Sequence, residues 1–179
     1  QYVWDSIMAA GAAFDITPYG TEAMHVLRAE MGFVIVGQET DGTVVPDDLG
    51  LSWSVSRSKR DFVGKRSLAR PDMVRPGRKQ LVGLLPRDHA MLLEEGAQVI
   101  ADAASTASLG HVTSAYRSDV LGRTFAMALV ADGRARIGQV MCVALGDKRI
   151  EVEVTQPKFI DGGLAAAVPH HAATGETAI

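Results

Sequence analysis

The adjacent carboxylates Asp47 and Asp48 have the residue types that general acid–base chemistry needs, so they are the first candidates for a catalytic site. Such a pair works when both side chains face the same substrate. Neighbouring side chains point apart, however, and Pro46 before them indicates a turn. We therefore do not expect catalysis by this pair, and we predict no catalytic residue elsewhere in the chain.

The histidines and the cysteine do not have the spacing of a metal site. Structural zinc needs four converging ligands, whereas the chain has one cysteine and no HxxxH or HExxH pattern. The histidines are His25, His89, His111, His170 and His171. We predict no bound metal. Cys142 lies inside an apolar run, and we expect it to be a buried, inert thiol.

Motifs for nucleotide binding and for serine hydrolysis are missing from the sequence. No GxGxxG pattern follows a predicted strand, so nothing would cradle a pyrophosphate, and Gly11 and Gly20 are isolated. No GxSxG elbow is present. We therefore expect no flavin or NAD chemistry in this chain.

The first part of the chain predicts two helices and two short strands. Apolar residues at three- and four-residue spacing predict a helix over residues 3–13. Thr21 is the expected N-cap of a second helix, which ends at Gly32. We expect a buried strand or extended segment at residues 33–36 and a strand at residues 51–55.

Beyond the linker-like residues 71–77, the pattern changes to short strands separated by turns. Regular short strands of this kind favour a small barrel or sandwich. The expected strands are residues 81–85, 98–101, 110–114, 124–130, 139–145 and 149–155. Residues 165–179 lack a strong period, and we expect a poorly ordered tail there.

Composition and charge limit the partners. The 179 residues are 47% hydrophobic and carry a net charge of −3, which gives no reason to expect nucleic acid or a membrane surface. No apolar run approaches the roughly 20 residues of a membrane span. A single cysteine fits the cytoplasm. One basic cluster stands out, and it is equally compatible with a solvated face and with a docking or steering surface: Arg57, Lys59, Arg60, Lys65 and Arg66.

Four ordered blocks resemble the aminomethyltransferase (glycine-cleavage T-protein) family. Residues 26–33 resemble its LRxExG helix end, residues 45–53 its TPxExGLxW segment and residues 61–68 its DFxGKxxL segment. Residues 110–130 resemble strands of its C-terminal barrel. The resemblance implies an α+β chain: residues 1–75 would be the C-terminal portion of a folate-binding domain, and residues 78–164 a small antiparallel β-barrel of six or seven strands.

Within the family, residues 19–23, 39–43 and 57–68 are most similar to alpha subunits of heterotetrameric sarcosine oxidases. This resemblance implies an intact enzyme that demethylates sarcosine oxidatively to glycine, makes hydrogen peroxide and passes the one-carbon unit to tetrahydrofolate. FAD, FMN and NAD would be bound elsewhere in the complex, and the beta, gamma and delta subunits would be partners. The alternatives are an aminomethyltransferase or folate-dependent demethylase, and a non-catalytic module that braces subunits.

The resemblance also implies which residues would meet folate. Tyr116 and Arg117, expected on the turn between two barrel strands, would stack on an aromatic ring of folate and pair with its carboxylates. The basic cluster would steer the polyglutamyl tail or dock a subunit. In the family, the pterin-anchoring carboxylate lies on a strand before this first helix, so the resemblance implies that it lies upstream of this chain. The helical pattern begins at Gln1, as in an excised fragment, and we expect this chain alone to be inactive. Arg28 and Glu30 are expected to brace the helix end, while Met24 replaces an arginine of the T-proteins.

Overall fold

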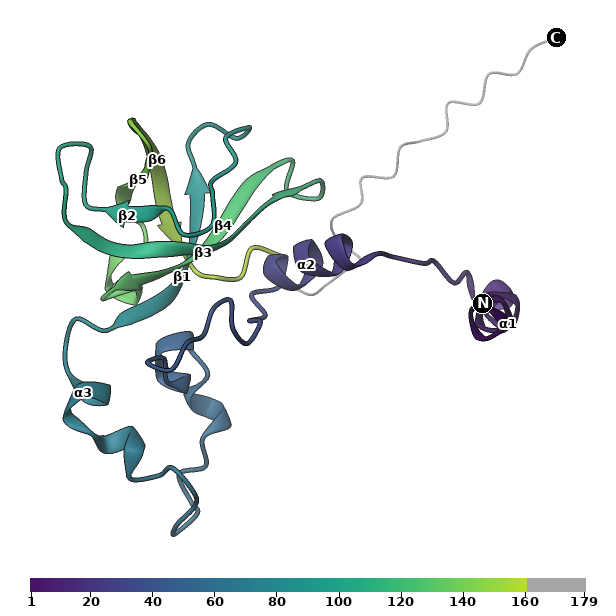
Figure 1. Cartoon of the computed structure of the whole chain (residues 1–179), viewed down its shortest axis with the longest axis horizontal. Coiled ribbons are helices and arrows are strands. Elements are labelled where there is room, and N and C mark those ends of the chain that lie inside the picture. The colour runs from purple at the N-terminus through teal and green to yellow at the C-terminus, as the bar shows by residue number, and fades with distance from the viewer. Residues whose placement is uncertain (161–179) are drawn as a thin grey trace.

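A computed structural model describes residues 1–160, in which a closed β-barrel follows a helical N-terminal part (Figure 1). The expected tail at residues 165–179, with His170 and His171, lies outside the described residues. The predicted α+β class with a small antiparallel barrel is confirmed. Within residues 1–160, no helix has the length and apolar character needed to cross a bilayer.

The barrel has six antiparallel strands in the order β1-β4-β3-β2-β5-β6, and β6 closes the ring on β1. All six predicted strands are present, with differences at their ends. Their bounds are β1 Lys79–Pro86, β2 Gln98–Ile100, β3 Ser108–Ser118, β4 Arg123–Ala131, β5 Val140–Leu145 and β6 Lys148–Thr155. Closure gives each of the six strands a neighbour on both sides.

Alternation along the strands builds an interior core of small and branched side chains. The interior cluster includes Val82, Leu84, Val99, Val112, Ala126, Ala128, Val130, Met141, Val143, Val152 and Val154. Strand β4 is buried on both faces, because its alternate residues Phe125, Met127 and Leu129 form a second cluster outside the barrel. Ala29 of helix α2 (Thr21–Glu30) belongs to that outer cluster, so α2 covers one wall of the barrel.

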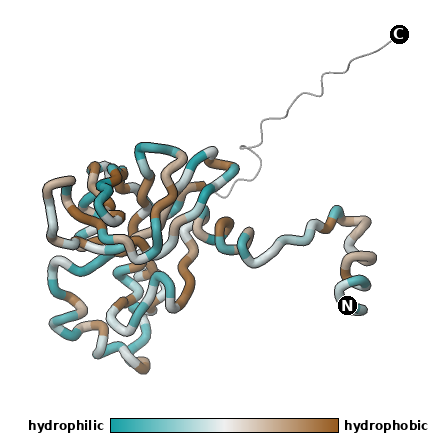
Figure 2. The backbone as a smooth tube through the Cα atoms, turned by 45° about the horizontal axis from the view of Figure 1, so that its top comes forward, coloured by the Kyte–Doolittle hydropathy of each residue, from teal (hydrophilic) through white to brown (hydrophobic). Residues whose placement is uncertain are grey.

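Helix α2 begins one residue away from the predicted cap. Gly20 is the N-cap and Thr21 is the first helical residue, so the expectation for Thr21 was wrong. The predicted end is confirmed, because Gly32 has φ +76°, a left-handed conformation that glycine adopts without steric cost. Helix α1 (Tyr2–Gly11) contains no buried residue and projects away from the barrel (Figures 1 and 2).

Residues 1–78 contain helices, turns, bends and irregular segments but no strand, so the strand expected at residues 51–55 is wrong, and residues 33–36 form neither a strand nor a buried segment. Residues 33–35 are irregular and a turn follows them, and both Phe33 and Val36 are exposed. Ser52–Ser54 form a 3-10 turn, closed by a hydrogen bond from the amide of Ser54 to the carbonyl of Leu51. Neither segment has a neighbouring strand to supply the hydrogen bonds of a sheet. The linker-like residues contain a short helix, α3 (Pro71–Val74).

Candidate functional site

Helix α2 carries Arg28 against the outer face of strand β3, where a buried polar cluster forms. Arg28 donates from Nη1 to Glu39 Oε2 at 2.8 Å and from Nη2 to Ser114 Oγ at 2.8 Å. The same Nη2 lies 3.0 Å from Gln38 Oε1 and 3.3 Å from the Tyr116 hydroxyl oxygen. We call these five residues the Arg28 cluster. Its ion pair is nearly dry, with side chains 9% and 0% exposed for Arg28 and Glu39.

The turn after α2 holds the carboxylate of Glu39 in place. The Glu39 amide bonds to the carbonyl of Ile35, and the Ile35 amide donates back to Glu39 Oε2 at 2.8 Å. Ser114 donates its hydroxyl proton to the other carboxylate oxygen. A buried charge is stable only when such partners compensate it. The cluster therefore fastens three distant segments, α2, the turn at residues 35–39 and β3, in one arrangement.

Glu30 makes a second bridge between α2 and β3. Ser118 donates its hydroxyl proton to Glu30 Oε1 at 2.5 Å and accepts a bond from the Leu121 amide at 2.9 Å. The amide of Phe159, after the last strand, donates to the Glu30 carbonyl at 2.9 Å. The expectation that Arg28 and Glu30 brace the helix end is confirmed by these contacts.

The structure places Tyr116 and Arg117 inside strand β3, so the predicted position on a turn was wrong. β3 continues to Ser118, because its pairing with β4 runs on through Tyr116↔Phe125 and Arg117↔Thr124. Adjacent residues of a strand point to opposite sides. The partly buried ring of Tyr116 joins the Arg28 cluster and the outer apolar cluster, whereas Arg117 is exposed. The two side chains do not converge.

The Tyr116 ring is held from two directions. Its centroid lies 6.2 Å from that of Phe125, and the Arg28 guanidinium carbon lies 5.8 Å from it. Arg28 donates to the hydroxyl oxygen, so the hydroxyl proton is free to point elsewhere. The result is a fixed, partly exposed aromatic ring with one available donor.

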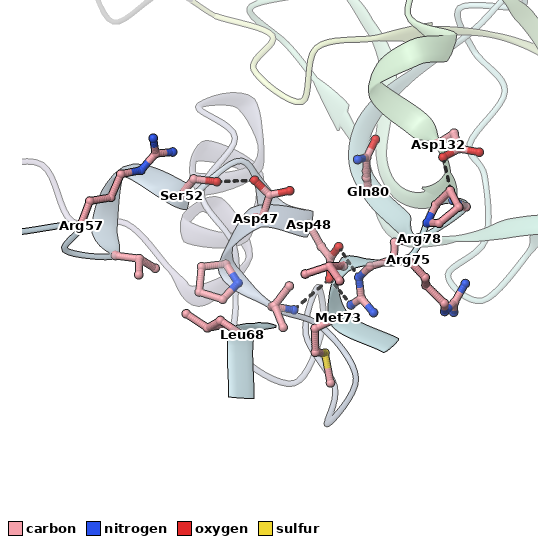
Figure 3. A pocket seen from close by; sticks show the side chains of 16 residues that line it. Asp47, Asp48, Ser52, Arg57, Leu68, Met73, Arg75, Arg78, Gln80 and Asp132 are labelled. Carbon is pink, nitrogen blue, oxygen red and sulfur yellow. Dashed lines mark hydrogen bonds and ion pairs between the residues drawn. The ribbon is translucent and has the colours of Figure 1, made fainter. Parts of the chain in front are cut away.

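A cavity of about 510 Å³ lies between residues 45–57, residues 68–78 and the barrel (Figure 3). Asp48 accepts a bond from Arg78 Nε at 2.9 Å. Asp47 faces Ser52 and also pairs with Arg134 at 2.9 Å. The prediction that the adjacent carboxylates point apart is confirmed.

Local bonding sets the electrostatics at this cavity. Hydrogen bonds from Ser52 and then from Arg134 lower the pKa of Asp47 below its ordinary value. The hydrogen bond to Asp48 raises the pKa of Arg78. A carboxyl whose pKa is lowered carries no proton to donate near neutral pH, so Asp47 suits ion pairing rather than acid catalysis.

The sequence did not point to three of the residues that hold these sites together. These residues are Ser114, Arg78 and the buried Glu39. Glu39 lies within residues 39–43, which carry the resemblance to the oxidase alpha subunits, but no local pattern there marks it as buried. Its partner Ser114 lies 75 residues away, and Arg78 lies 30 residues from Asp48. Periodicity reports local structure, and it carries no signal for contacts at such separations.

Two family models match most of the chain. The GCVT N-terminal domain matches residues 1–59, and the glycine cleavage T-protein C-terminal barrel domain matches residues 79–161. The chain belongs to the glycine-cleavage T-protein family of aminomethyltransferase-like proteins.

Within that family, the sarcosine oxidase alpha subunit of Corynebacterium sp. (strain P-1) is 52% identical over 164 residues, which cover 89% of this chain and 17% of that protein. The alpha subunit of Rhizobium meliloti is 39% identical, over 90% of this chain and 17% of that protein. An aminomethyltransferase of Nitrosomonas europaea is 35% identical, over 90% of this chain and 42% of that protein. The chain thus spans about a sixth of the length of the alpha subunits it matches.

A solved structure shows the same fold. The glycine cleavage system aminomethyltransferase T of Bartonella henselae superposes with a TM-score of 0.67 and 24% identity. The match covers 77% of this chain and 38% of that one. At this level of identity, the comparison establishes the fold alone.

Proposed function

We propose that this chain is the folate-side portion of a sarcosine oxidase alpha subunit. The intact enzyme would demethylate sarcosine oxidatively to glycine with formation of hydrogen peroxide, and would transfer the one-carbon unit to tetrahydrofolate. The observation that supports this most is the 52% identity to one such subunit over 89% of the chain, against 35% to an aminomethyltransferase.

Tyr116 fits a role in holding tetrahydrofolate, because its ring is fixed in place and partly exposed. Aromatic faces of this kind stack on flat ring systems. Arg117 is exposed near the end of the same strand and points to its other face, so it would pair with a carboxylate at the far end of the ligand and not with the stacked ring. When bound, tetrahydrofolate supplies the amine that accepts the one-carbon unit. This chain's residues contribute orientation, which raises the rate by proximity.

The rest of the chemistry would lie outside these residues. We place the general base, FAD, FMN and NAD elsewhere in the proposed complex, with beta, gamma and delta subunits as partners, in the cytoplasm. The division into residues 1–75 and 78–164 is part of this proposal. Helix α1 supports a place in a larger complex, because it has exposed apolar residues that another part of the complex could cover. These residues are Tyr2, Val3, Trp4 and Ile7.

The test is an assay of the assembled oxidase that carries this chain, with two products measured separately. Tyr116→Ala should lower formation of methylene-tetrahydrofolate about tenfold or more, while peroxide formation from sarcosine stays unchanged. Tyr116→Phe retains the ring and should retain most transfer. Arg117→Gln should weaken folate binding, and Arg87→Gln, at another exposed arginine of the barrel, is its matched control.

Three results would overturn the proposal. One is an assembled protein that makes no peroxide from sarcosine but transfers an aminomethyl group. This result would establish an aminomethyltransferase, the alternative that the 35% identity supports. Another is unchanged transfer in both Tyr116→Ala and Arg117→Gln, which would leave a subunit-bracing module. The third is peroxide formation from sarcosine by this chain alone, which we predict to be inactive.

A further inference from the structure

Residues 51–76 form a lobe beside the barrel that contains no buried residue (Figure 1). It consists of two 3-10 turns, Ser52–Ser54 and Ser67–Ala69, the short helix α3 and irregular segments. A segment of this length without a core of its own does not hold its shape through apolar burial. Its large apolar side chains instead face solvent: Trp53 is 81% exposed, and Val63 is fully exposed.

The charge of the lobe is opposite to that of the chain. Residues 51–76 contain seven basic and two acidic residues, a net charge of +5, whereas the whole chain has −3. The basic residues are Arg57, Lys59, Arg60, Lys65, Arg66, Arg70 and Arg75. A field of one sign on an otherwise acidic protein attracts a partner of the opposite sign.

Internal hydrogen bonds hold the loop that carries the basic residues 57–60. Lys65 Nζ turns inward and donates to the carbonyls of Lys59 at 2.6 Å and Arg60 at 3.0 Å. The amide of Lys59 donates to Ser56 Oγ at 3.2 Å. Arg57, Lys59 and Arg60 are exposed, as is Trp53, and Arg57 and Trp53 line the same shallow hollow. Arginine and tryptophan together are the residue types that dominate binding at protein interfaces.

Arg78 anchors the base of the lobe on both sides. Its guanidinium bonds to Asp48 and to the Thr43 carbonyl (2.7 Å) before the lobe, and to the Asp72 carbonyl (2.8 Å) near its end. The cavity of about 510 Å³ opens at this base, with Leu68 and Met73 among its lining residues (Figure 3). A surface fixed in advance loses less conformational entropy when it binds.

We propose that this lobe is a docking surface for an acidic protein surface that inserts an apolar side chain into the cavity at its base. The partner is another subunit of the oxidase complex, so this inference rests on the proposed function. Exposed Trp53 favours a protein over a small anion, because an aromatic ring without a core partner becomes stable by burial in an interface. The basic residues provide attraction and register, and Trp53 provides apolar burial.

The test compares two triple variants of the alpha-type polypeptide that carries this chain, each losing three positive charges. Arg57→Gln/Lys59→Gln/Arg60→Gln removes charge from the lobe, and Arg87→Gln/Lys148→Gln/Arg149→Gln removes it from exposed barrel positions. Association with the purified partner subunits is measured by native mass spectrometry and sedimentation velocity. Measurements at about 50 and 500 mM NaCl change the screening length roughly threefold.

At low salt, the lobe variant should raise the subunit dissociation constant at least about tenfold, and the barrel variant less than about twofold. The difference should shrink at high salt. Trp53→Ala should also weaken association, with little dependence on salt. The charge-preserving variant Arg57→Lys/Lys59→Arg/Arg60→Lys should associate like the parent, which separates charge from any effect on folding.

Equal association of the two triple variants would overturn the inference. So would a loss confined to self-association, or a loss confined to binding of an RNA oligonucleotide, because these outcomes would assign the lobe to a second copy or to nucleic acid. Peroxide and methylene-tetrahydrofolate formation are measured on the same samples. If both products form normally and the lobe variant assembles like the parent, the docking surface alone is contradicted. If the parent complex forms neither product and the lobe variant still weakens assembly, the proposed function alone is contradicted.

Discussion

Arg28 and Glu39 lie eleven residues apart in the chain and meet in an ion pair of 2.8 Å that strand β3 shields from water. Each member has further partners: Ser114 bonds to both, and Tyr116 and Gln38 bond to Arg28. The pair is therefore a junction among segments that local sequence signals do not connect. The position of the Tyr116 ring depends on it.

Removing one member of this pair should destabilise the fold strongly. Arg28→Ala leaves the Glu39 carboxylate buried without its counter-charge, and such losses cost about 3–5 kcal/mol. Urea unfolding of the purified variant measures the change in the free energy of unfolding. Arg75→Ala, which breaks the exposed pair with Asp72, is the control and should cost at most about 1 kcal/mol. Similar costs for the two variants would contradict the junction.

Gly110 is a second sensitive position, because strand β3 passes close to β4 there. A β-carbon at this residue would overlap the Leu129 carbonyl and lie 2.8 Å from Val130 Cα. Gly110→Ala should therefore destabilise the barrel by about 1–3 kcal/mol or more. Gly42→Ala is the matched control, since no atom lies within 4 Å of its added carbon. Thermal unfolding followed by circular dichroism would compare them, and equal midpoints would refute the close approach.

Cys142 should react slowly while the barrel is folded. Burial raises the pKa of its thiol above the ordinary value of about 9, and the thiolate is the reactive form. Since the folded state holds the proton more tightly, the thiol's contribution to stability should fall as pH rises through about 9. The chain has one cysteine, so labelling with a thiol reagent reports on this group alone. Equal labelling rates in buffer and in urea would contradict its burial.

His111 should make stability depend on pH in the opposite direction. Desolvation, then the positive charge of Lys79, lowers the pKa of His111 below its ordinary value of about 6.5. The unfolded chain then binds the proton more readily, so stability should be lost as pH falls below about 6.5. His111→Gln should flatten the profile of unfolding free energy between about pH 5 and 7. An unchanged slope in this variant would refute the lowered pKa.

The barrel could be predicted from sequence because each strand carries its own signal. Residues 124–130 form a short apolar run bounded by turn residues, and residues 149–155 alternate strictly, as their burial confirms. Residues 33–36 and 51–55 carry similar local patterns, yet they are not strands. A strand needs a hydrogen-bonded neighbour, and no local pattern reports whether one is present.

The candidate site was less predictable for a related reason. The family resemblance made Tyr116 a candidate for folate binding. Its predicted position on a turn was wrong, because the pairing of β3 with β4 extends further than the apolar pattern. The Arg28 cluster joins residues up to 88 positions apart. Polar side chains at such separation leave no periodic trace, so only the folded arrangement brings them together.

The pairing order of the barrel has a consequence for how the chain acquires its shape during synthesis. Strand β1 is made first, yet its neighbours are β4 and β6, and β6 ends at Thr155. The ribosome must therefore release almost the entire barrel sequence before the first strand obtains its last partner. A barrel that closes by pairing its first strand with its last depends on contacts between residues distant in sequence, and such contacts form slowly. Until then, β1 exposes bonding groups that a chaperone or a neighbouring nascent chain can reach.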